Sequence, residues 1–299
     1  MINKVKPPNF LVLVNPISGG GSGAKIAPLL PDIFKNHGLT AEVFLMTGPG
    51  SAGEIIRDCA ANFSGLVAVG GDGTINEVAS AVFKTGCRKP VGIIPLGLSN
   101  CLARHLNLPR TLDGAVATLA RGARRTVDAA SFGEGLAVAF IGAGLDAAMV
   151  RRVAMGRRGP VSNWIYIKAG LAAWRKEPWP EIEAEVDGRR LKGGYYLAIL
   201  CAITNYAAFF NIPPGEGYRL YLFRGRGMTG LLRSALGLGS GLNLTAAADL
   251  IVPVRESLAF FSPAGAGHFQ YDGEYGGPLP VNCRIHPAAL SFFTGARSS

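Results

Sequence analysis

Two domains of different class are predicted along the 299-residue sequence: an α/β domain over residues 1–127 and an antiparallel β-sandwich over residues 128–286. Up to residue 127, short apolar runs alternate with helix-like segments, which is typical of a mostly parallel sheet covered by helices. After Asp128, strand-like runs with period-two alternation dominate, as in an antiparallel sandwich. Because 48% of the residues are apolar and 17% are charged, each part can bury a core of its own.

The first domain is expected to alternate strand and helix. Such repetition builds a Rossmann-like sheet, in which ligands bind at the carboxyl ends of the strands. Three glycine-rich segments follow expected strands, so we expect a ligand site at that edge. The expected strands are residues 10–14, 40–46, 65–69 and 91–95, and the expected helices are residues 24–36, 53–62, 76–83, 99–106 and 112–121.

The second domain is expected to consist of short strands joined by turns, with one helical insertion. The expected strands are residues 129–131, 136–141, 182–186, 194–203, 218–223 and 258–262, and the expected helix is residues 163–176.

The segment VAVGGDGTINEVASAV, residues 67–82, predicts a phosphate site. A buried strand there ends in a glycine turn, and a helix begins near Thr74, whose free amide groups favour anionic ligands. We expect the glycines to adopt positive φ angles and to let the backbone approach a ligand closely. Asp72 is expected in a solvent-facing turn, where a carboxylate can handle a proton or hold a metal near phosphate. Alternatively, Asp72 only caps the helix and the glycines only turn the chain.

Three further motifs stand in order along the chain: VNPISGGGSGAK at residues 14–25, GIIPLGLSNCLARHLNLP at residues 92–109 and QYDGEYGG at residues 270–277. With GGDGTINEV, they resemble the NPxSGxG, GGDGTxNEV, PLGTxNDxAR and DGE motifs of the diacylglycerol kinase catalytic family. That family includes bacterial diacylglycerol and related lipid kinases and the eukaryotic sphingosine kinases. The four motifs keep the family's order from residue 14 to residue 277.

The resemblance implies the fold shared by NAD kinases and lipid kinases. In that fold the first domain binds nucleotide, residues 287–299 return to it, and the sandwich takes the lipid. The implied activity is ATP-dependent phosphorylation of a membrane-lipid hydroxyl, most simply of diacylglycerol to phosphatidic acid, with Mg²⁺ as cofactor. The implied partners are ATP and the lipid substrate.

The same resemblance places the nucleotide at the strand ends of the first domain. Thr47 matches a position where the family has a threonine near the nucleotide, although by itself it would be a turn residue. The expected nucleotide-binding residues are Asn15, Ser18, Gly19, Lys25, Thr47, Gly70, Gly71, Asp72, Gly73, Thr74, Asn76, Leu98 and Asn100.

A carboxylate pair, Asp272 and Glu274, is expected to carry the chemistry. Two residues apart in an extended strand, both side chains point to one face; a hairpin with Asp-Gly as its turn is the competing interpretation. Because the family's glutamate acts as proton acceptor, the resemblance predicts Glu274 as the base, with Asp272 and Asp72 organising metal and hydroxyl. Sphingosine kinases suggest the reverse assignment, with Asp72 as the base.

Two other acidic residues match family positions. Asp146, in FIGAGLDAAMV at residues 140–150, resembles the GxDA segment and is a candidate for contacting the acceptor headgroup. Alternatively, it caps the helix that follows. Glu216 stands where the family has an aspartate that helps to hold a structural magnesium, so Glu216 and Asp272 are the candidate metal ligands.

The chain departs from the family pattern in ways that leave other functions open. Leu98 replaces the usual threonine, Cys101 replaces the usual aspartate and Glu216 replaces the aspartate of the metal site. A catalytically weakened nucleotide- or lipid-binding module of the same fold is therefore one alternative. NAD kinase is another, because it shares the GGDGT loop, although it lacks the NPxSG opening.

The charge and the cysteines bear on partners and location. A net charge of +10 indicates an anionic partner. No nucleic acid is expected, because recognisable nucleic-acid motifs are missing from the sequence. An anionic membrane surface fits the charge, and residues 151–176 are the best candidate contact because arginines alternate there with aromatic residues. Five scattered cysteines are typical of reduced thiols. We expect a cytoplasmic, peripherally membrane-associated protein, and the oligomeric state is open, a homodimer included.

Overall fold

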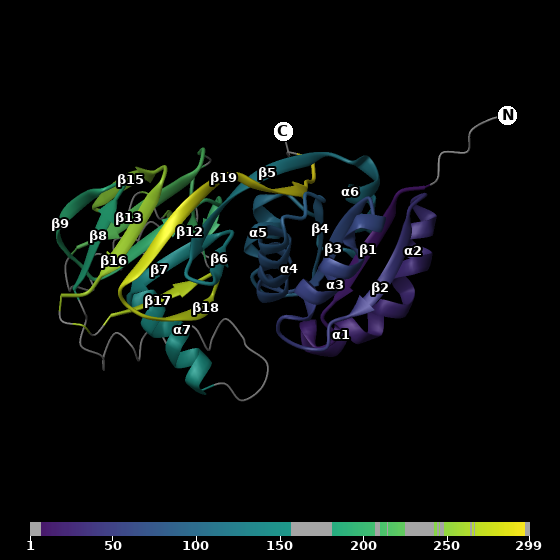
Figure 1. Ribbon diagram of the computed structural model, residues 1–299, viewed down its shortest axis with the longest axis horizontal. Coiled ribbons are helices and arrows are strands. Elements are labelled where there is room, and N and C mark those ends of the chain that lie inside the picture. Colours follow the sequence, from purple (N-terminus) through teal and green to yellow (C-terminus); the bar gives the residue numbers. More distant parts are fainter. Residues whose placement is uncertain are drawn as a thin grey trace. The chain divides into compact units, whose positions relative to one another are not determined.

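The computed structural model describes residues 7–156, 181–206, 210–213, 215–224, 242–243, 245, 248–263, 265 and 267–296. The chain divides into two compact units, which are both drawn in Figure 1. One is Met1–Val127 with Ala288–Ser299, and the other is Asp128–Pro287. The first is an α/β unit and the second is built from antiparallel strands, so the predicted fold class is confirmed.

The first unit contains a parallel sheet with strand order β2-β1-β3-β4. The last strand of the chain, β19 (Val281–Phe293), ends in this unit, where Phe292 pairs in parallel with Val91. Strands β3 and β4 are buried along their whole length, as expected for a sheet covered on both faces. The bounds are β1 Asn9–Val14, β2 Thr40–Leu45, β3 Gly65–Gly70 and β4 Val91–Pro95.

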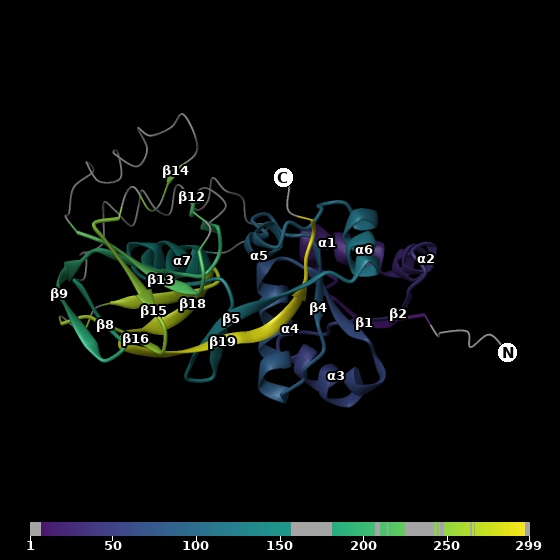
Figure 2. The same cartoon turned by 90° about the horizontal axis from the view of Figure 1, so that it is seen from above.

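Helices cover both faces of this sheet, with α3 and α4 on one face and α2 and α6 on the other (Figure 2). Buried side chains such as Phe34 of α2 and Leu119 of α6 share one core cluster with Val12 and Val67 of the strands. The bounds are α1 Ser18–Ile26, η1 Ala27–Leu29, α2 Leu30–Asn36, α3 Ser51–Cys59, η2 Ala60–Asn62, α4 Asp72–Thr85, α5 Cys101–His105 and α6 Leu112–Arg121.

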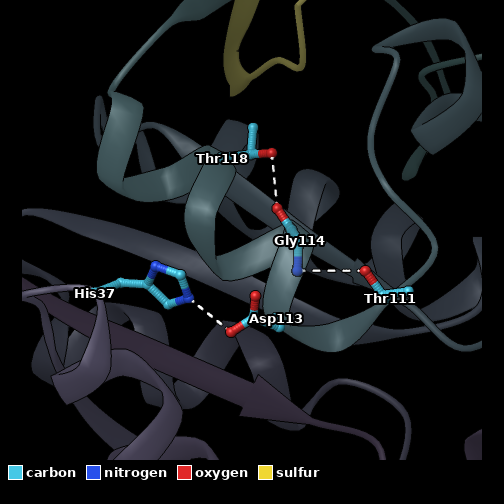
Figure 3. Close-up of polar contacts among 5 residues, drawn as sticks. All are labelled: His37, Thr111, Asp113, Gly114 and Thr118. Carbon is cyan, nitrogen blue, oxygen red and sulfur yellow. Dashed lines mark hydrogen bonds and ion pairs between the residues drawn. The ribbon is translucent and has the colours of Figure 1, made fainter.

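Local polar contacts fix the start of α6 and tie it to α2 (Figure 3). The Thr111 hydroxyl caps α6 by accepting a hydrogen bond of 3.3 Å from the Gly114 amide. A Cβ at Gly114 would lie only 2.7 Å from that hydroxyl oxygen, so the tight cap requires glycine there. Asp113 then pairs with His37, at the end of α2, over 2.8 Å. This exposed pair is away from the strand ends that form the site below.

The second unit contains a six-stranded sheet in the order β15-β13-β10-β7-β17-β18. A second group of strands runs β19-β16-β8-β9, with β5 pairing with β19 and β6, and β11, β12 and β14 form a small sheet of their own. The bounds are β5 Arg124–Phe132, β6 Gly135–Ala137, β7 Phe140–Gly144, α7 Leu145–Gly156, β8 Ile182–Val186, β9 Arg189–Tyr195, β10 Leu197–Cys201, β11 Asn205–Tyr206, β12 Phe210–Asn211, β13 Tyr218–Phe223, β14 Leu242–Asn243, β15 Leu250–Val254, β16 Ser257–Phe261, β17 His268–Tyr271 and β18 Glu274–Pro278.

One hydrophobic core joins the two larger groups of strands. Leu200 and Leu220 from β10 and β13 belong to the same buried cluster as Ala184 and Phe260 from β8 and β16. Two sheets that share a core in this way form a sandwich, as the sequence predicts.

Several elements differ from the expectation. The helix expected at residues 24–36 is three pieces, and α1 begins earlier than expected, with left-handed backbone at Gly19, Gly20 and Gly21. Strand 136–141 is split into β6 and β7, because the amides of Val138 and Ala139 bond to a distant side chain. The helix α7 was expected only as a helix of unstated length near Asp146, and the helix expected at residues 163–176 lies outside the described residues. Within the described residues, no helix is both long and apolar enough to span a bilayer.

Candidate functional site

Three loops meet at the carboxyl ends of the strands in the first unit. The Asn15 amide, just after β1, donates to the Val69 carbonyl of β3 over 3.1 Å, and the Leu96 amide, just after β4, donates to the Gly70 carbonyl over 2.8 Å. Backbone hydrogen bonds therefore hold the segments after β1, β3 and β4 side by side, where an open α/β sheet binds its ligands.

The Thr74 hydroxyl is the centre of the first polar cluster at this edge. It accepts a hydrogen bond of 3.0 Å from Asn15 Nδ2 and lies 3.4 Å from the Ser18 hydroxyl. Asn15 also accepts from the Ile17 amide through Oδ1, which fixes its side chain. Three of the expected nucleotide-binding residues, from two loops, are therefore in direct contact.

The glycines of this edge serve close packing more than left-handed backbone. Gly71 has φ −89°, and Gly70 has no left-handed φ either, which corrects the expectation of positive φ angles in the GGDG turn. A Cβ at Gly70 would collide with the Thr74 side chain, and one at Gly97 would lie 2.7 Å from Gly71 Cα. Left-handed backbone occurs instead in the first loop, where Gly19 has φ 62°.

Asp72 joins the loop after β3 to the loop after β4. Its Oδ2 accepts from the Asn100 amide over 2.8 Å and its Oδ1 accepts from the Cys101 amide over 2.7 Å, at the start of α5. Burial raises the pKa of the Asp72 carboxyl, and these two amides and the charge of Arg104 oppose that shift. The side chain is half-buried rather than solvent-facing, and it caps α5 rather than its own helix.

Most of the remaining nucleotide candidates lie outside these hydrogen bonds, and Asn100 takes part in them only through its backbone amide. Lys25 and Thr47 are exposed, and the Leu98 side chain is 47% exposed. Asn76 is buried in α4, where its Oδ1 accepts a hydrogen bond from Ser80. Asn100 has left-handed backbone, and its side-chain amide bonds both polar backbone groups of Gly97, which shapes the loop that carries Leu98.

Sequence reasoning missed Glu77, although it belongs to the GGDGTINEV motif. Its Oε1 accepts from the Gly50 amide over 2.9 Å and from the Ala52 amide over 3.4 Å. A carboxylate on α4 thus caps the start of α3 and holds the loop that follows Thr47. The glutamate in the motif marked a residue of interest, but its sequence neighbours could not show that it holds a loop about 25 residues earlier in the chain.

In the second unit, Asp272 is tied to the backbone. Its carboxylate accepts hydrogen bonds of 2.8 to 2.9 Å from the amides of Val138, Ala139 and Phe140, and its φ is 47°. Asp187 does the same in another Asp-Gly turn, where its carboxylate accepts from three successive amides at residues 255–257. The hairpin interpretation of the DGE segment is therefore correct: Asp272 is in the turn, and Glu274 begins β18 with an exposed side chain.

Asp146 lies buried in the first turn of α7. Its Oδ2 accepts from the Tyr206 hydroxyl over 2.6 Å and from Gln270 Nε2 over 2.9 Å, while Oδ1 accepts from the Ala147 amide. Burial raises the pKa of the Asp146 carboxyl to about 6, and these hydrogen bonds oppose the shift. Perturbed carboxyl groups of this kind are common at functional sites. Tyr206 and Gln270 were not among the candidates from sequence.

The two expected metal ligands do not form a metal site. Both oxygens of Asp272 are occupied by backbone amides, and Glu216 is an exposed side chain. Among the described residues, His, Cys, Asp and Glu side chains form no group of three or more that could hold a metal ion. A magnesium site built by Glu216 and Asp272 does not fit this geometry.

Comparisons with known proteins agree with these motifs. Residues 9–132 match the family model described as "Diacylglycerol kinase catalytic domain". A protein of Bacillus subtilis (strain 168) named "Diacylglycerol kinase" is 24% identical over 276 residues, which is 90% of each chain. A protein of the same name from Staphylococcus aureus (strain bovine RF122 / ET3-1) is also 24% identical, over 91% of this chain and 87% of its own length.

Solved structures agree on the fold. The crystal structure of a diacylglycerol kinase from Bacillus anthracis str. Sterne matches 98% of this chain and 99% of its own, with a TM-score of 0.76. At 17% sequence identity, that likeness concerns the fold alone.

Proposed function

Because residues 9–132 match the family model of the diacylglycerol kinase catalytic domain, we propose that this chain is an ATP-dependent lipid kinase. It would phosphorylate a hydroxyl of a membrane lipid, and diacylglycerol, giving phosphatidic acid, is the simplest substrate. The observation that carries the proposal is the junction of three loops at the strand ends, in which Thr74 contacts Asn15 and Ser18.

The start of α4 supports a phosphate site at this junction. Gly71 is its N-cap and provides no side-chain cap, so the first amides of a 14-residue helix remain directed toward the loops. The Asp72 carboxylate accepts from two amides at the start of α5 and from its own amide, which leaves the amides of Gly73 and Thr74 to the loops. We place the nucleotide phosphates here, with Asn15, Ser18 and Thr74 as contacts.

Phosphoryl transfer then requires a group that takes the proton of the attacking hydroxyl. The lipid oxygen forms a bond to the γ-phosphorus, the bond to the β–γ bridging oxygen breaks, and ADP leaves. Glu274 is our candidate acceptor of the hydroxyl proton, because its side chain is exposed and Asp272 fixes the turn before it. Mg²⁺ would enter with ATP, since it commonly binds through substrate phosphates.

The test is to supply γ-labelled ATP and Mg²⁺ with vesicles that contain diacylglycerol, ceramide or sphingosine, and in a separate reaction with NAD. We expect label in phosphatidic acid. Label in NAD would replace the proposal with NAD kinase. ATP binding without transfer to any of these acceptors would replace it with the binding module that Leu98 and Cys101 suggest.

Glu274→Gln tests the proposed base, because it keeps the shape and removes the proton acceptor. We expect kcat to fall by about 100-fold or more, the usual contribution of a general base. Glu256→Gln removes the same charge from an exposed turn of the same unit and is the matched control. Equal activity in the two variants would remove Glu274 from the mechanism.

A further inference from the structure

A buried glutamine connects two parts of the second unit. Gln270 in β17 is only 1% exposed, and both ends of its side-chain amide are engaged. Nε2 donates to Asp146 Oδ2 over 2.9 Å, and Oε1 accepts from the Gly273 amide over 3.0 Å. Only this orientation satisfies both partners, because a carboxylate accepts and a backbone N–H donates. One side chain therefore joins the first turn of α7 to the turn before Glu274.

The neighbouring strand leaves space for this connection. Gly142 of β7 is the register partner of Gln270. A Cβ at Gly142 would collide with Asp146 Oδ2 and lie 2.7 Å from Gln270 Nε2. The backbone of Gly142 is not left-handed, so a glycine is needed there for space and not for conformation. Glycine at position 142 thus leaves room for the Gln270 side-chain amide to reach the Asp146 carboxylate.

Each end of the connection is anchored separately. Tyr206 and the Ala147 amide hold Asp146, and Tyr206 itself packs against the ring of Phe140 at 4.9 Å between centroids. On the other side, the three amides that bond Asp272 fix the turn. Gln270 is the side chain that bonds to both anchored parts.

We propose that Gln270 is a positioning residue that sets the turn carrying Glu274 relative to Asp146, through its simultaneous hydrogen bonds to Asp146 and to the Gly273 amide. The inference rests on the proposed function, in which Glu274 takes the proton; Asp146 enters as the residue that the family resemblance makes a candidate for contacting the acceptor. Gln270 itself contacts neither substrate in this proposal, and it acts by holding these two carboxylates at a fixed separation.

Amide hydrogen exchange at Gly273 tests the connection without any assay of activity. In the wild-type protein we expect exchange at least about tenfold slower than in an unstructured chain, because the amide is hydrogen-bonded. Gln270→Met keeps the size of the side chain and removes both bonds, so the protection should be lost. An unprotected Gly273 amide in the wild type would overturn the proposal, even if no variant folds.

Kinetics test the positioning role. We expect Gln270→Met to lower kcat for lipid phosphorylation about tenfold or more, with the KM for ATP within about twofold of wild type. Tyr275→Phe is the matched control, because it removes a hydrogen bond of 2.9 Å to His268 within the same β17–β18 hairpin. A similar fall in kcat in both variants would mean that the hairpin only needs to be stable, and would overturn the proposal.

Combining Asp146→Asn with Gln270→Met tests whether Gln270 acts through its hydrogen bond to Asp146. If Gln270 acts through Asp146, adding Gln270→Met to Asp146→Asn should lower kcat by less than it does in the wild type. Full additivity would contradict the proposal. If the wild type phosphorylates no lipid, the proposed function fails, whereas protection at Gly273 still tests the connection.

Discussion

At Asp146, burial and hydrogen bonding act on the carboxyl group in opposite directions. Burial raises its pKa from 3.8 to about 6, despite donors from Tyr206, Gln270 and Ala147. The native state therefore binds a proton more tightly than the unfolded chain does. Stability from this group is fully present below the unfolded pKa and is lost as pH rises through the native pKa. Keeping Asp146 ionised at neutral pH opposes folding, which is typical of a residue retained for function.

Asp146→Asn tests this sign, because asparagine does not titrate. From about pH 5 to about pH 7.5, the free energy of unfolding of the wild type should fall by about 1 kcal/mol relative to the variant. Urea unfolding at the two pH values measures the difference, and the pH dependence cancels any constant effect of the substitution. An identical pH dependence in both proteins would mean that Asp146 has an ordinary pKa.

Among the helices, α4 and α5 are joined through one carboxylate. Asp72 begins α4 but caps α5, so it sets the loop of Leu98 and Asn100 against the GGDG turn. We expect Asp72→Ala to raise the KM for ATP about tenfold and to cost about 1 to 2 kcal/mol of stability, as the loss of a helix cap usually does. Steady-state kinetics and thermal unfolding measure the two effects.

Asp113→Ala is the control for Asp72→Ala, because it removes an exposed carboxylate from the first turn of α6 and breaks only the pair with His37 (Figure 3). Its effect on the KM for ATP should be negligible. If Asp72→Asn instead abolishes turnover while the KM for ATP stays unchanged, then Asp72, and not Glu274, is the proton acceptor.

Elements defined by local pattern could be predicted, and those defined by distant contacts could not. Strand β4 and helix α6 have the expected bounds, since a short apolar run, the Thr111 cap and the glycine after α6 are all local signals. Residues 136–141 have the composition of one strand, yet the amides of Val138 and Ala139 bond to Asp272, more than 130 residues away. Such a pairing leaves no periodic mark in the sequence.

The residues of the candidate site also divide into those with a signal in the local sequence and those defined by distant contacts. The motifs identified Asn15, Ser18 and Thr74, which the fold brings into contact. They also singled out Asp272, but as an acid near a metal and not as an anchor for backbone amides. Gln270 could not be recognised, because a glutamine next to a DGE motif looks like any other strand residue until Gly142 is known to face it. The roles of the individual residues stay predictions.

For the whole molecule, a net charge of +10 and a lipid substrate raise the question of membrane contact. Part of the candidate stretch is described: Arg151 and Arg152 are half-buried on α7, near Met155, whose side chain is 77% exposed. The rest of the stretch, residues 157–176, lies outside the described residues. An exposed apolar side chain with arginines beside it is typical of a helix that meets anionic lipid.

Replacing Arg151 and Arg152 together with glutamine should weaken binding to anionic vesicles by about 10- to 30-fold, since each basic residue near such a surface contributes about 1 kcal/mol. The control replaces Arg110 and Arg121, two exposed arginines of the first unit, and so removes the same charge. Sedimentation with vesicles at increasing salt measures the loss, because salt screens these charges. Activity on a short-chain soluble lipid should stay near wild type in both variants. If vesicle binding weakens equally in both variants, the overall charge and not α7 drives binding. If the variant of Arg151 and Arg152 loses activity on the soluble lipid, these arginines serve the fold or the active site.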